Sequence, residues 1–261
     1  KTIFIKKSSI IELTLLKFIN SQNPHTAVHC FGTCLHESCV YMVLEYLDRT
    51  LEDQFDLLKK LEFDSYKIFF KNIVMQLITI VDSLNSMGIS HNDIKEINIM
   101  VDRDNRLRLI DFGISDYIGF MPSNEFIENL LCTEYIKPSE TTVESSNKIR
   151  TLNVDIYSVG VIICNFIFNT RFYKYISVNG FIYNRPYKSP DKMFYQINPQ
   201  SIIEIDKMFP NLSDLLVKII ADNNQIRYYP KEILKHKFFD TDEDFIKNDR
   251  NTKIFRTIPD F

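Results

Sequence analysis

The feature that most constrains this chain is the stretch SHNDIKEINIMVDRDNRLRLIDFG, residues 90–113. It places an acid, a lysine and an amide close together, at Asp93, Lys95 and Asn98, and a second acid, Asp111, directly before Phe-Gly. The runs NIMV and RLRLI flank the polar turn DRDN, which predicts a β-hairpin that returns Asp111 towards Asn98. Amide and carboxylate oxygens are ordinary ligands of Mg²⁺. The stretch is therefore either a phosphoryl-transfer centre or a polar turn with a hairpin.

Composition and charge exclude several classes of protein. A chain of 261 residues, 45% hydrophobic and 25% charged, can bury a sizeable core as one large domain or two small lobes. The net charge of -3 and the pI near 6.0 argue against a nucleic-acid or anionic-membrane partner. The longest apolar run, residues 159–168, is much shorter than the roughly 20 residues of a membrane helix. We therefore expect a globular protein without nucleic-acid or membrane partners.

The cysteines and the first residue give two further expectations. The five cysteines show neither a CxxC pair nor zinc-type histidine spacing, and they occupy positions 30, 34, 39, 132 and 164. This favours a reduced compartment, cytoplasmic or nuclear, with the cysteines as small core residues. Because the sequence begins at Lys1 inside an expected strand, we expect it to be a piece of a longer protein.

Residues 1–50 are expected to form a small sheet with one helix. KTIFIKK, residues 1–7, has the pattern of a strand, and SSIIELTLLKFI, residues 8–19, has the apolar spacing of a helix. The β-rich runs AVHCFGTCL and CVYMVLEYL, residues 27–35 and 39–47, are separated by the polar turn HES. They predict an antiparallel hairpin.

From residue 51 onward helices dominate. We expect a helix over LEDQFDLLKKL, then a long helix that ends near Gly88. The apolar side chains of the long helix recur on one face, at Phe70, Ile73, Val74, Leu77, Val81 and Leu84. Residues 114–148 show no clear periodicity, which is typical of a functional loop. Helices are expected again at residues 153–168, 211–221 and 230–236.

Together these motifs resemble the eukaryotic protein kinases of the Ser/Thr type. HNDIKEIN is similar to the catalytic loop H-R-D-x-K-x-x-N, and DFG follows it at the spacing of the family. Further resemblances occur in family order: IELTLLKFI to the αC helix, VYMVLEYL to the strand before the hinge, CTEYIKPSE to the end of the activation segment, VDIYSVG to the start of αF, and NQIRYYPKEILKHKFF to the closing helices. The resemblance implies an α+β, bilobal kinase-like fold. Its partial N-terminal β-lobe with one helix would span residues 1–47, and its mainly helical C-terminal lobe residues 48–261.

The resemblance also implies roles for individual residues. Asp93 would orient the substrate hydroxyl or accept its proton, and Lys95 would neutralise the transferring phosphate. Asn98 and Asp111 would hold Mg²⁺, and Asp155 would brace the catalytic loop. The residues expected to contact or support ATP are Lys6, Glu12, the gatekeeper Leu44, the hinge residues Glu45 to Leu47, and Met100 beneath adenine.

The sequence departs from the family in two central places. Asn92 stands where the family has arginine, so switching by phosphorylation of the activation loop is not expected. The segment YIKPSE holds one residue more than usual, which leaves Ser139 or Glu140 as the family's glutamate. We favour Glu140, because Arg227 needs an acid to pair with.

The N-terminal region departs most. All six glycines, at positions 32, 88, 113, 119, 160 and 180, lie after the first strand, so no Gly-rich phosphate loop precedes it. Lys6 fits the strand lysine but places Phe4 against adenine, and Lys7 would place Ile5 there. Both lysines could equally be solvated strand-end residues.

Two other residues also have structural alternatives. Glu12 could pair with Lys6, or it could complete a helix-capping box with Ser9. His91 is expected to be a packed structural histidine rather than an acid-base group.

These departures leave two main hypotheses for the function. The first is a Ser/Thr protein kinase that uses ATP and Mg²⁺ on protein hydroxyls, with a possible regulatory protein partner. The second is a pseudokinase that presents its surfaces to a partner with weak or no phosphotransfer. A small-molecule phosphotransferase is a third reading, but it does not explain DIYSVG, the PSE segment and Arg227 together.

Overall fold

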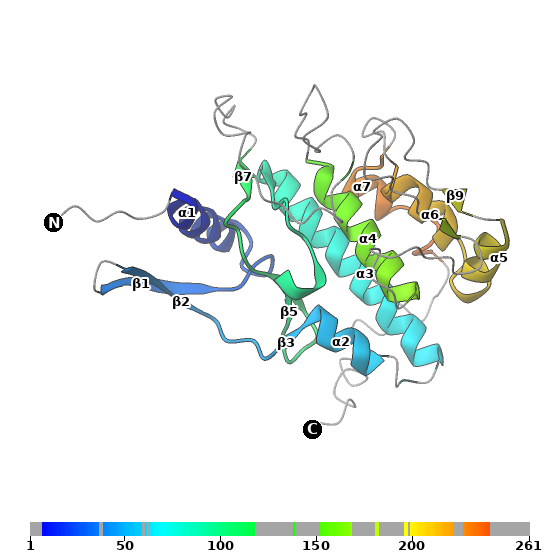
Figure 1. Cartoon of the computed structure of the whole chain (residues 1–261), viewed down its shortest axis with the longest axis horizontal. Coiled ribbons are helices and arrows are strands. Elements are labelled where there is room, and N and C mark those ends of the chain that lie inside the picture. Colours follow the sequence, from blue (N-terminus) through cyan, green and yellow to red (C-terminus); the bar gives the residue numbers. More distant parts are fainter. Residues whose placement is uncertain are drawn as a thin grey trace.

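The computed structural model describes residues 7–36, 39–58, 61, 63–117, 138, 152–168, 181–182, 196–197, 199–221 and 227–240. The helices are α1 (Lys7–Gln22), α2 (Leu51–Leu58), α3 (Phe63–Ser86), η1 (Glu96–Asn98), α4 (Val154–Phe168), α5 (Pro199–Met208), α6 (Leu212–Ile219) and α7 (Pro230–Ile233). The strands are β1 (Cys30–His36), β2 (Cys39–Leu44), β3 (Arg49–Thr50), β4 (Ile89–Ser90), β5 (Ile99–Val101), β6 (Leu107–Leu109), β7 (Asp116–Tyr117), β8 (Phe181–Ile182) and β9 (Gln196–Ile197). In Figure 1, α1 and the β1–β2 hairpin lie together at one end, and the remaining helices at the other. The predicted α+β class is confirmed.

Helix α1 and the β1–β2 hairpin form the N-terminal part of the described structure. The hairpin is antiparallel as predicted, with Cys34 opposite Tyr41. The apolar side chains Leu15, Leu16 and Ile19 of α1 are buried. Helix α1 begins at Lys7, so Ser9 lies within it and cannot be its N-cap, and the predicted capping box is wrong. The strand expected over residues 1–6 lies outside the described residues, whereas Lys7, expected in that strand, is helical.

The segment between α1 and β1 is bonded to the hairpin β5–β6. Leu109 N–H donates to the Thr26 carbonyl at 3.1 Å, and Val28 N–H donates to the Leu109 carbonyl at 2.9 Å. Ala27 and Leu109 thereby form a parallel β-bridge. On the other side, Asn20 of α1 donates from Nδ2 to the Val28 carbonyl at 3.1 Å. The segment therefore connects α1 to the strand that leads into Asp111.

Helix α3 is the centre of the core. Every residue of its predicted apolar stripe is buried, and the helix is followed by Gly88 at φ 72°, a left-handed conformation that favours glycine. Phe70 of α3 stacks on Phe166 of α4 at a centroid distance of 4.8 Å. Among the described helices, Asp64–Ser86 of α3 is long and apolar enough to cross a membrane, but 56% of its apolar window is buried inside the fold, as in the core helix of a globular protein.

Short strands build the surface that carries the site. β3, β5 and β6 form a three-stranded antiparallel sheet, and β4 pairs with β7. The predicted hairpin of residues 99–109 is confirmed by the register Ile99 to Leu109. Helix α2 follows β3 directly, and Thr50 caps it: Asp53 N–H donates to Thr50 Oγ1 at 3.2 Å, and Thr50 N–H donates to Asp53 Oδ2 at 2.9 Å.

The C-terminal helices include one that the sequence did not predict. Helices α6 and α7 match the predicted segments, whereas α5, residues 199–208, was not expected. Its apolar pattern is weak, since Ile205 is buried but Ile203 is 49% exposed. The expectation that the cysteines are core residues holds for Cys164 and is wrong for Cys34, which is exposed.

Candidate active site

The loop that carries Asp93 is held from beneath by Asp155 at the start of α4. Asp155 is fully buried, and its carboxylate accepts hydrogen bonds from His91 N–H at 2.7 Å and Asn92 N–H at 2.9 Å. Burial raises the pKa of the Asp155 carboxyl, and these hydrogen bonds partly offset that rise because they stabilise the charged form. The loop thus depends on a buried acid that is hydrogen-bonded to backbone, as predicted for this residue.

His91 is a structural residue. It is fully buried, its ring lies 4.8 Å from that of Phe112, and Asp93 N–H donates to its Nδ1 at 3.2 Å. Nε2 therefore carries the proton and donates it to the Ile110 carbonyl at 3.0 Å. Burial is the main cause that lowers the pKa of His91, which favours this neutral form. His91 ties Asp93 to the strand end before Asp111, in agreement with the expected structural role.

Asp93, Lys95 and Asn98 lie together as the sequence predicts. Lys95 Nζ is 2.7 Å from Asp93 Oδ2. Asn98 Nδ2 donates to the same oxygen at 2.9 Å and to the Asp93 carbonyl at 3.0 Å. Asp93 is 6% exposed, so its carboxylate is oriented by these protein partners rather than by water. The arrangement fixes the orientation of the Asp93 carboxylate, and a fixed orientation is what an acceptor of a hydroxyl proton requires.

Asp111 lies at the end of the hairpin, next to Asn98. The Ile110 N–H donates to the Asn98 carbonyl at 3.0 Å. Asp111 is the next residue along the chain after Ile110, so this hydrogen bond keeps its backbone near Asn98. Asp111 is exposed and has φ 64°, a conformation that aspartate tolerates better than most residues. Because the Asn98 amide nitrogen is used by Asp93, its oxygen remains the atom that suits a cation. Among the described residues no three His, Cys, Asp or Glu side chains form a metal cluster, so a cation here would need oxygens from a nucleotide or water.

Glu12 projects from α1 towards this acid. The Phe112 N–H is hydrogen-bonded to Glu12 and lowers its pKa, but burial and the nearby Asp111 carboxylate outweigh it, so the pKa of Glu12 is raised. Glu12 therefore contacts the DFG segment instead of capping its own helix. Its expected partner Lys6 lies outside the described residues.

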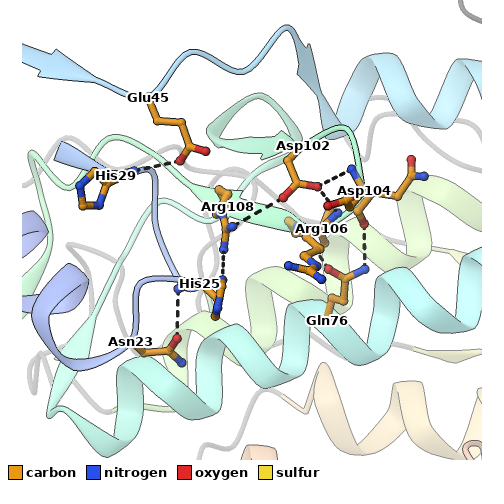
Figure 2. Close-up of polar contacts among 11 residues, drawn as sticks. Asn23, His25, His29, Glu45, Gln76, Asp102, Asp104, Arg106 and Arg108 are labelled. Carbon is orange, nitrogen blue, oxygen red and sulfur yellow. Dashed lines mark hydrogen bonds and ion pairs between the residues drawn. The ribbon is translucent and has the colours of Figure 1, made fainter. Parts of the chain in front are cut away.

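The residues expected around adenine follow β2 and lie in β5. Leu44 is 37% exposed, and Glu45 and Leu47 are partly buried. Figure 2 shows Glu45 beside His29, whose N–H donates to Glu45 Oε2 at 3.2 Å. Met100 is partly buried in β5, where it pairs with Arg108 of β6. Leu44 ends β2, Glu45 and Leu47 lie in the connection to β3, and Met100 pairs with Thr50 of β3.

Arg108 is a buried arginine with polar partners that the sequence did not reveal. Figure 2 shows its guanidinium between Asp102 and His25: Nη1 donates to His25 Nδ1 at 3.1 Å, and Nη2 lies 3.5 Å from Asp102 Oδ2. Gln76 of α3 reaches the same hairpin, donating to the Asn105 carbonyl at 3.0 Å. The alternation of Arg106 and Arg108 with leucines resembles a strand with one solvated face, yet Arg108 is only 7% exposed. Its partners come from distant segments, which periodicity cannot indicate.

Comparison with known proteins identifies the family. The family model described as "Protein kinase domain" matches residues 4–239. The chain belongs to the protein kinase family. Cyclin-dependent kinase 7 of Caenorhabditis elegans is 27% identical over 62% of this chain and 46% of its own length. The serine/threonine-protein kinase PKH2 of Saccharomyces cerevisiae is 29% identical over 88% of this chain and 20% of its own length. A probable serine/threonine-protein kinase of Dictyostelium discoideum is 22% identical over 97% of this chain and 61% of its own length.

The kinase domain therefore spans less than two thirds of the length of each of these relatives. Within it, the segment that resembles the start of αF begins α4, with Asp155 in its first turn. The predicted end of the activation segment, CTEYIKPSE, lies outside the described residues except for Pro138. Arg227 is 2% exposed and donates to the carbonyls of Ala221 and Asn153 at 2.7 and 3.1 Å. Glu140, the acid predicted to pair with Arg227, and its alternative Ser139 lie outside the described residues.

Proposed function

We propose that this protein kinase domain transfers the γ-phosphate of ATP to serine and threonine hydroxyls of proteins. The observation that carries the proposal is the position of Asp93, which is bonded to both Lys95 and Asn98, while Asp111 stands next to Asn98. Phosphoryl transfer requires positioning and neutralisation of charge more than covalent chemistry. These four side chains offer an acceptor for a proton, a cation for the phosphate and two oxygens for a metal.

Each residue has a defined task in this proposal. Asp93 Oδ2 is held by Lys95 and Asn98, so its carboxylate is oriented to accept the hydroxyl hydrogen of a substrate. Lys95 remains close enough to stabilise the negative charge of the transferring group. The lysine two residues after the aspartate is the family pattern of Ser/Thr rather than Tyr kinases.

The residues present fit ATP with Mg²⁺. Mg²⁺ prefers oxygen ligands and keeps several waters, and Asn98 with Asp111 supplies one amide and one exposed carboxylate. The metal would neutralise phosphate charge at this position. Glu45, Leu47 and Met100 would contact adenine next to the gatekeeper Leu44, and Lys6 with Glu12 would support the phosphates. The boundary between the two lobes would fall at residues 47 and 48, in the connection between β2 and β3.

A second candidate function is a pseudokinase whose surfaces bind a partner protein. The observation in its favour is that residues 1–31 contain no glycine, so these residues supply no Gly-rich loop for the phosphates. The two candidates differ in their response to nucleotide. Either one would act inside the cell, in the cytoplasm or nucleus, with protein substrates or a regulatory protein as partners.

Transfer of radiolabelled phosphate to a generic protein substrate tests the proposal. The protein is incubated with labelled ATP and Mg²⁺, and Asp93→Asn serves as the matched control because it preserves size while removing the proton acceptor. We expect labelling of serine and threonine by the unmodified protein and loss of that labelling in Asp93→Asn. Equal labelling by both proteins, or none by either, would contradict the proposal.

A thermal shift with Mg-ATP separates the two candidates. A ligand at 100 times its Kd stabilises the folded state by about 2.7 kcal/mol. We expect a rise in Tm that requires both Mg²⁺ and ATP and that disappears in Asp111→Asn. No shift at saturating nucleotide, combined with no phosphotransfer, would favour the pseudokinase.

A further inference from the structure

Asn92 occupies a special position in the loop that carries Asp93. Its φ is 67°, in the left-handed region where asparagine is favoured over most residues. Its N–H is bonded to Asp155, and the residue is 9% exposed. The side chain is therefore directed into the protein by a backbone that two buried hydrogen bonds of Asp155 fix in place.

Every polar atom of the Asn92 side chain has a partner. Nδ2 donates to the Ile114 carbonyl at 3.1 Å and to Asp116 Oδ2 at 3.1 Å. Oδ1 accepts a hydrogen bond from Ser90 Oγ at 2.8 Å. An amide has two N–H donors and one oxygen, so both donors are committed to the segment that follows Gly113. The bond to the Asp116 carboxylate is charge-assisted and stronger than one between neutral groups.

Backbone pairing joins the same two segments. Ser90 of β4 pairs with Asp116 of β7, and Ile89 pairs with Tyr117. Ser115 Oγ donates to the His91 carbonyl at 3.0 Å. Asn92 thus adds side-chain hydrogen bonds at one end of the pairing between the loop before Asp93 and the segment after Asp111. A shift of either segment would change the separation of these two acids.

We propose, building on the function proposed above, that Asn92 is a positioning residue that fixes Asp93 and Asp111 relative to one another through Asp116. The anion that Asn92 binds is a carboxylate built into the chain, so the site assembles without a phosphate added to the segment after Gly113. A neutral amide whose two donors are already used offers little to a phosphate, whereas arginine would offer a charged, forked donor. The asparagine at position 92, where the family has arginine, is therefore accompanied by its own partner, the Asp116 carboxylate.

Charge exchange between residues 92 and 116 tests this role. Asn92→Asp removes both donors and places a carboxylate against Asp116, and we expect kcat to fall roughly ten- to a hundredfold with little change in the KM for ATP. Asp116→Asn keeps an acceptor and is expected to have a small effect. The double variant restores an amide opposite a carboxylate and should recover most of the lost kcat. Failure of the double variant to recover, with all variants folded, would overturn the proposal.

Asn211→Asp is the matched control. Asn211 also has a left-handed backbone, at φ 65°, and its side chain makes no capping hydrogen bond. The same substitution there should leave kcat within about twofold of the unmodified protein. An equal loss of kcat in Asn211→Asp and Asn92→Asp would show a general effect of the substitution and refute the positioning role.

Removal of phosphate tests the second half of the proposal. The unmodified protein is treated with a phosphatase until its intact mass shows no phosphate, and turnover is measured before and after. We expect turnover to stay within about twofold, because Asn92 and Asp116 supply the contact. A loss of more than tenfold that is reversed by rephosphorylation would overturn the proposal.

Amide hydrogen exchange keeps the test independent of catalysis. The amides of Ser115, Asp116 and Tyr117 should exchange faster in Asn92→Asp and return towards the original rate in the double variant. If the unmodified protein transfers no phosphate but this pattern is observed, the proposed function fails while the Asn92–Asp116 contact stands. Unchanged exchange in Asn92→Asp would refute the contact itself.

Discussion

Replacement of Asp155 by alanine should destabilise the protein far more than replacement of Asp111. The Asp155 carboxylate accepts two buried backbone hydrogen bonds, at 2.7 and 2.9 Å, and Asp155→Ala leaves both donors without their acceptor. An unsatisfied buried donor costs about 1–3 kcal/mol, which gives about 2–6 kcal/mol for the pair. Removal of the buried carboxylate also abolishes its own desolvation cost, which the raised pKa reveals. The net loss of stability is therefore expected near about 2–4 kcal/mol, a fall in Tm on the order of 10 °C.

Differential scanning calorimetry without ligand measures this difference. Asp111 is exposed and its φ is 64°, so asparagine, which tolerates the left-handed region, is the suitable replacement. Asp111→Asn should keep Tm within about 2 °C, since surface substitutions usually change stability by less than about 0.5 kcal/mol. Asp155→Asn is a further control, because one carbonyl oxygen remains to accept a hydrogen bond. If Asp111→Asn unfolds the protein and Asp155→Ala melts normally, our assignment of Asp155 as the support of the loop is wrong.

Two further predictions concern stability. Hydrogen bonds from Thr50 are the largest cause that lowers the pKa of Asp53 below 3.8, so the Asp53 carboxylate should stabilise α2 above that pH and lose its effect as pH falls through the lower, folded-state pKa. The stability difference between the unmodified protein and Asp53→Asn, measured by urea unfolding from pH 6 to pH 2, should shrink over this acidic range, and Thr50→Ala should cost about 0.5–2 kcal/mol at neutral pH. A difference that does not vary with pH would contradict this account. Gly160→Ala should destabilise by about 1–3 kcal/mol in the same assay, because a Cβ would lie 2.4 Å from Ile220 Cγ2 and 2.6 Å from Ile219 Cγ2. A stable Gly160→Ala variant would show that α4 and α6 can separate at no cost.

The parts of the site that the sequence predicts are those determined by short spacing. Asp93, Lys95 and Asn98 lie within six residues of one another, and the contacts of Lys95 and Asn98 with Asp93 follow from that proximity. The hairpin of residues 99–109 then brings Asp111 next to Asn98, because β-pairing of a short turn leaves little freedom in register. Asp155 was also placed correctly, since an acid at the start of an apolar helix needs a buried partner.

The parts that could not be predicted depend on contacts between distant segments. The buried Arg108 guanidinium is hydrogen-bonded to His25 and paired with Asp102. A periodic pattern of apolar residues cannot predict these contacts. Asn92 was recognised only as a missing arginine, since its bond to Asp116 requires the pairing of β4 with β7. The Ser9–Glu12 spacing predicted a capping box and therefore a later start of α1 than Lys7. Glu12 is instead hydrogen-bonded to the backbone of Phe112, a contact that local spacing cannot predict.

The bonds between Thr26, Val28 and Leu109 have a mechanical consequence for α1. The unit of α1 and the β1–β2 hairpin leaves covalently through residues 45–48, and it is pinned to β6 at this second point. Any rotation that keeps both attachments must turn about a line through them. Glu12 lies ten residues before the end of α1, about 15 Å along the helix, so a turn of about 5° about an axis through that end moves it by at most about 1.3 Å. That displacement is enough to make or break a hydrogen bond to Phe112. A small rotation of α1 is therefore amplified at Glu12, because Glu12 lies far from the pivot.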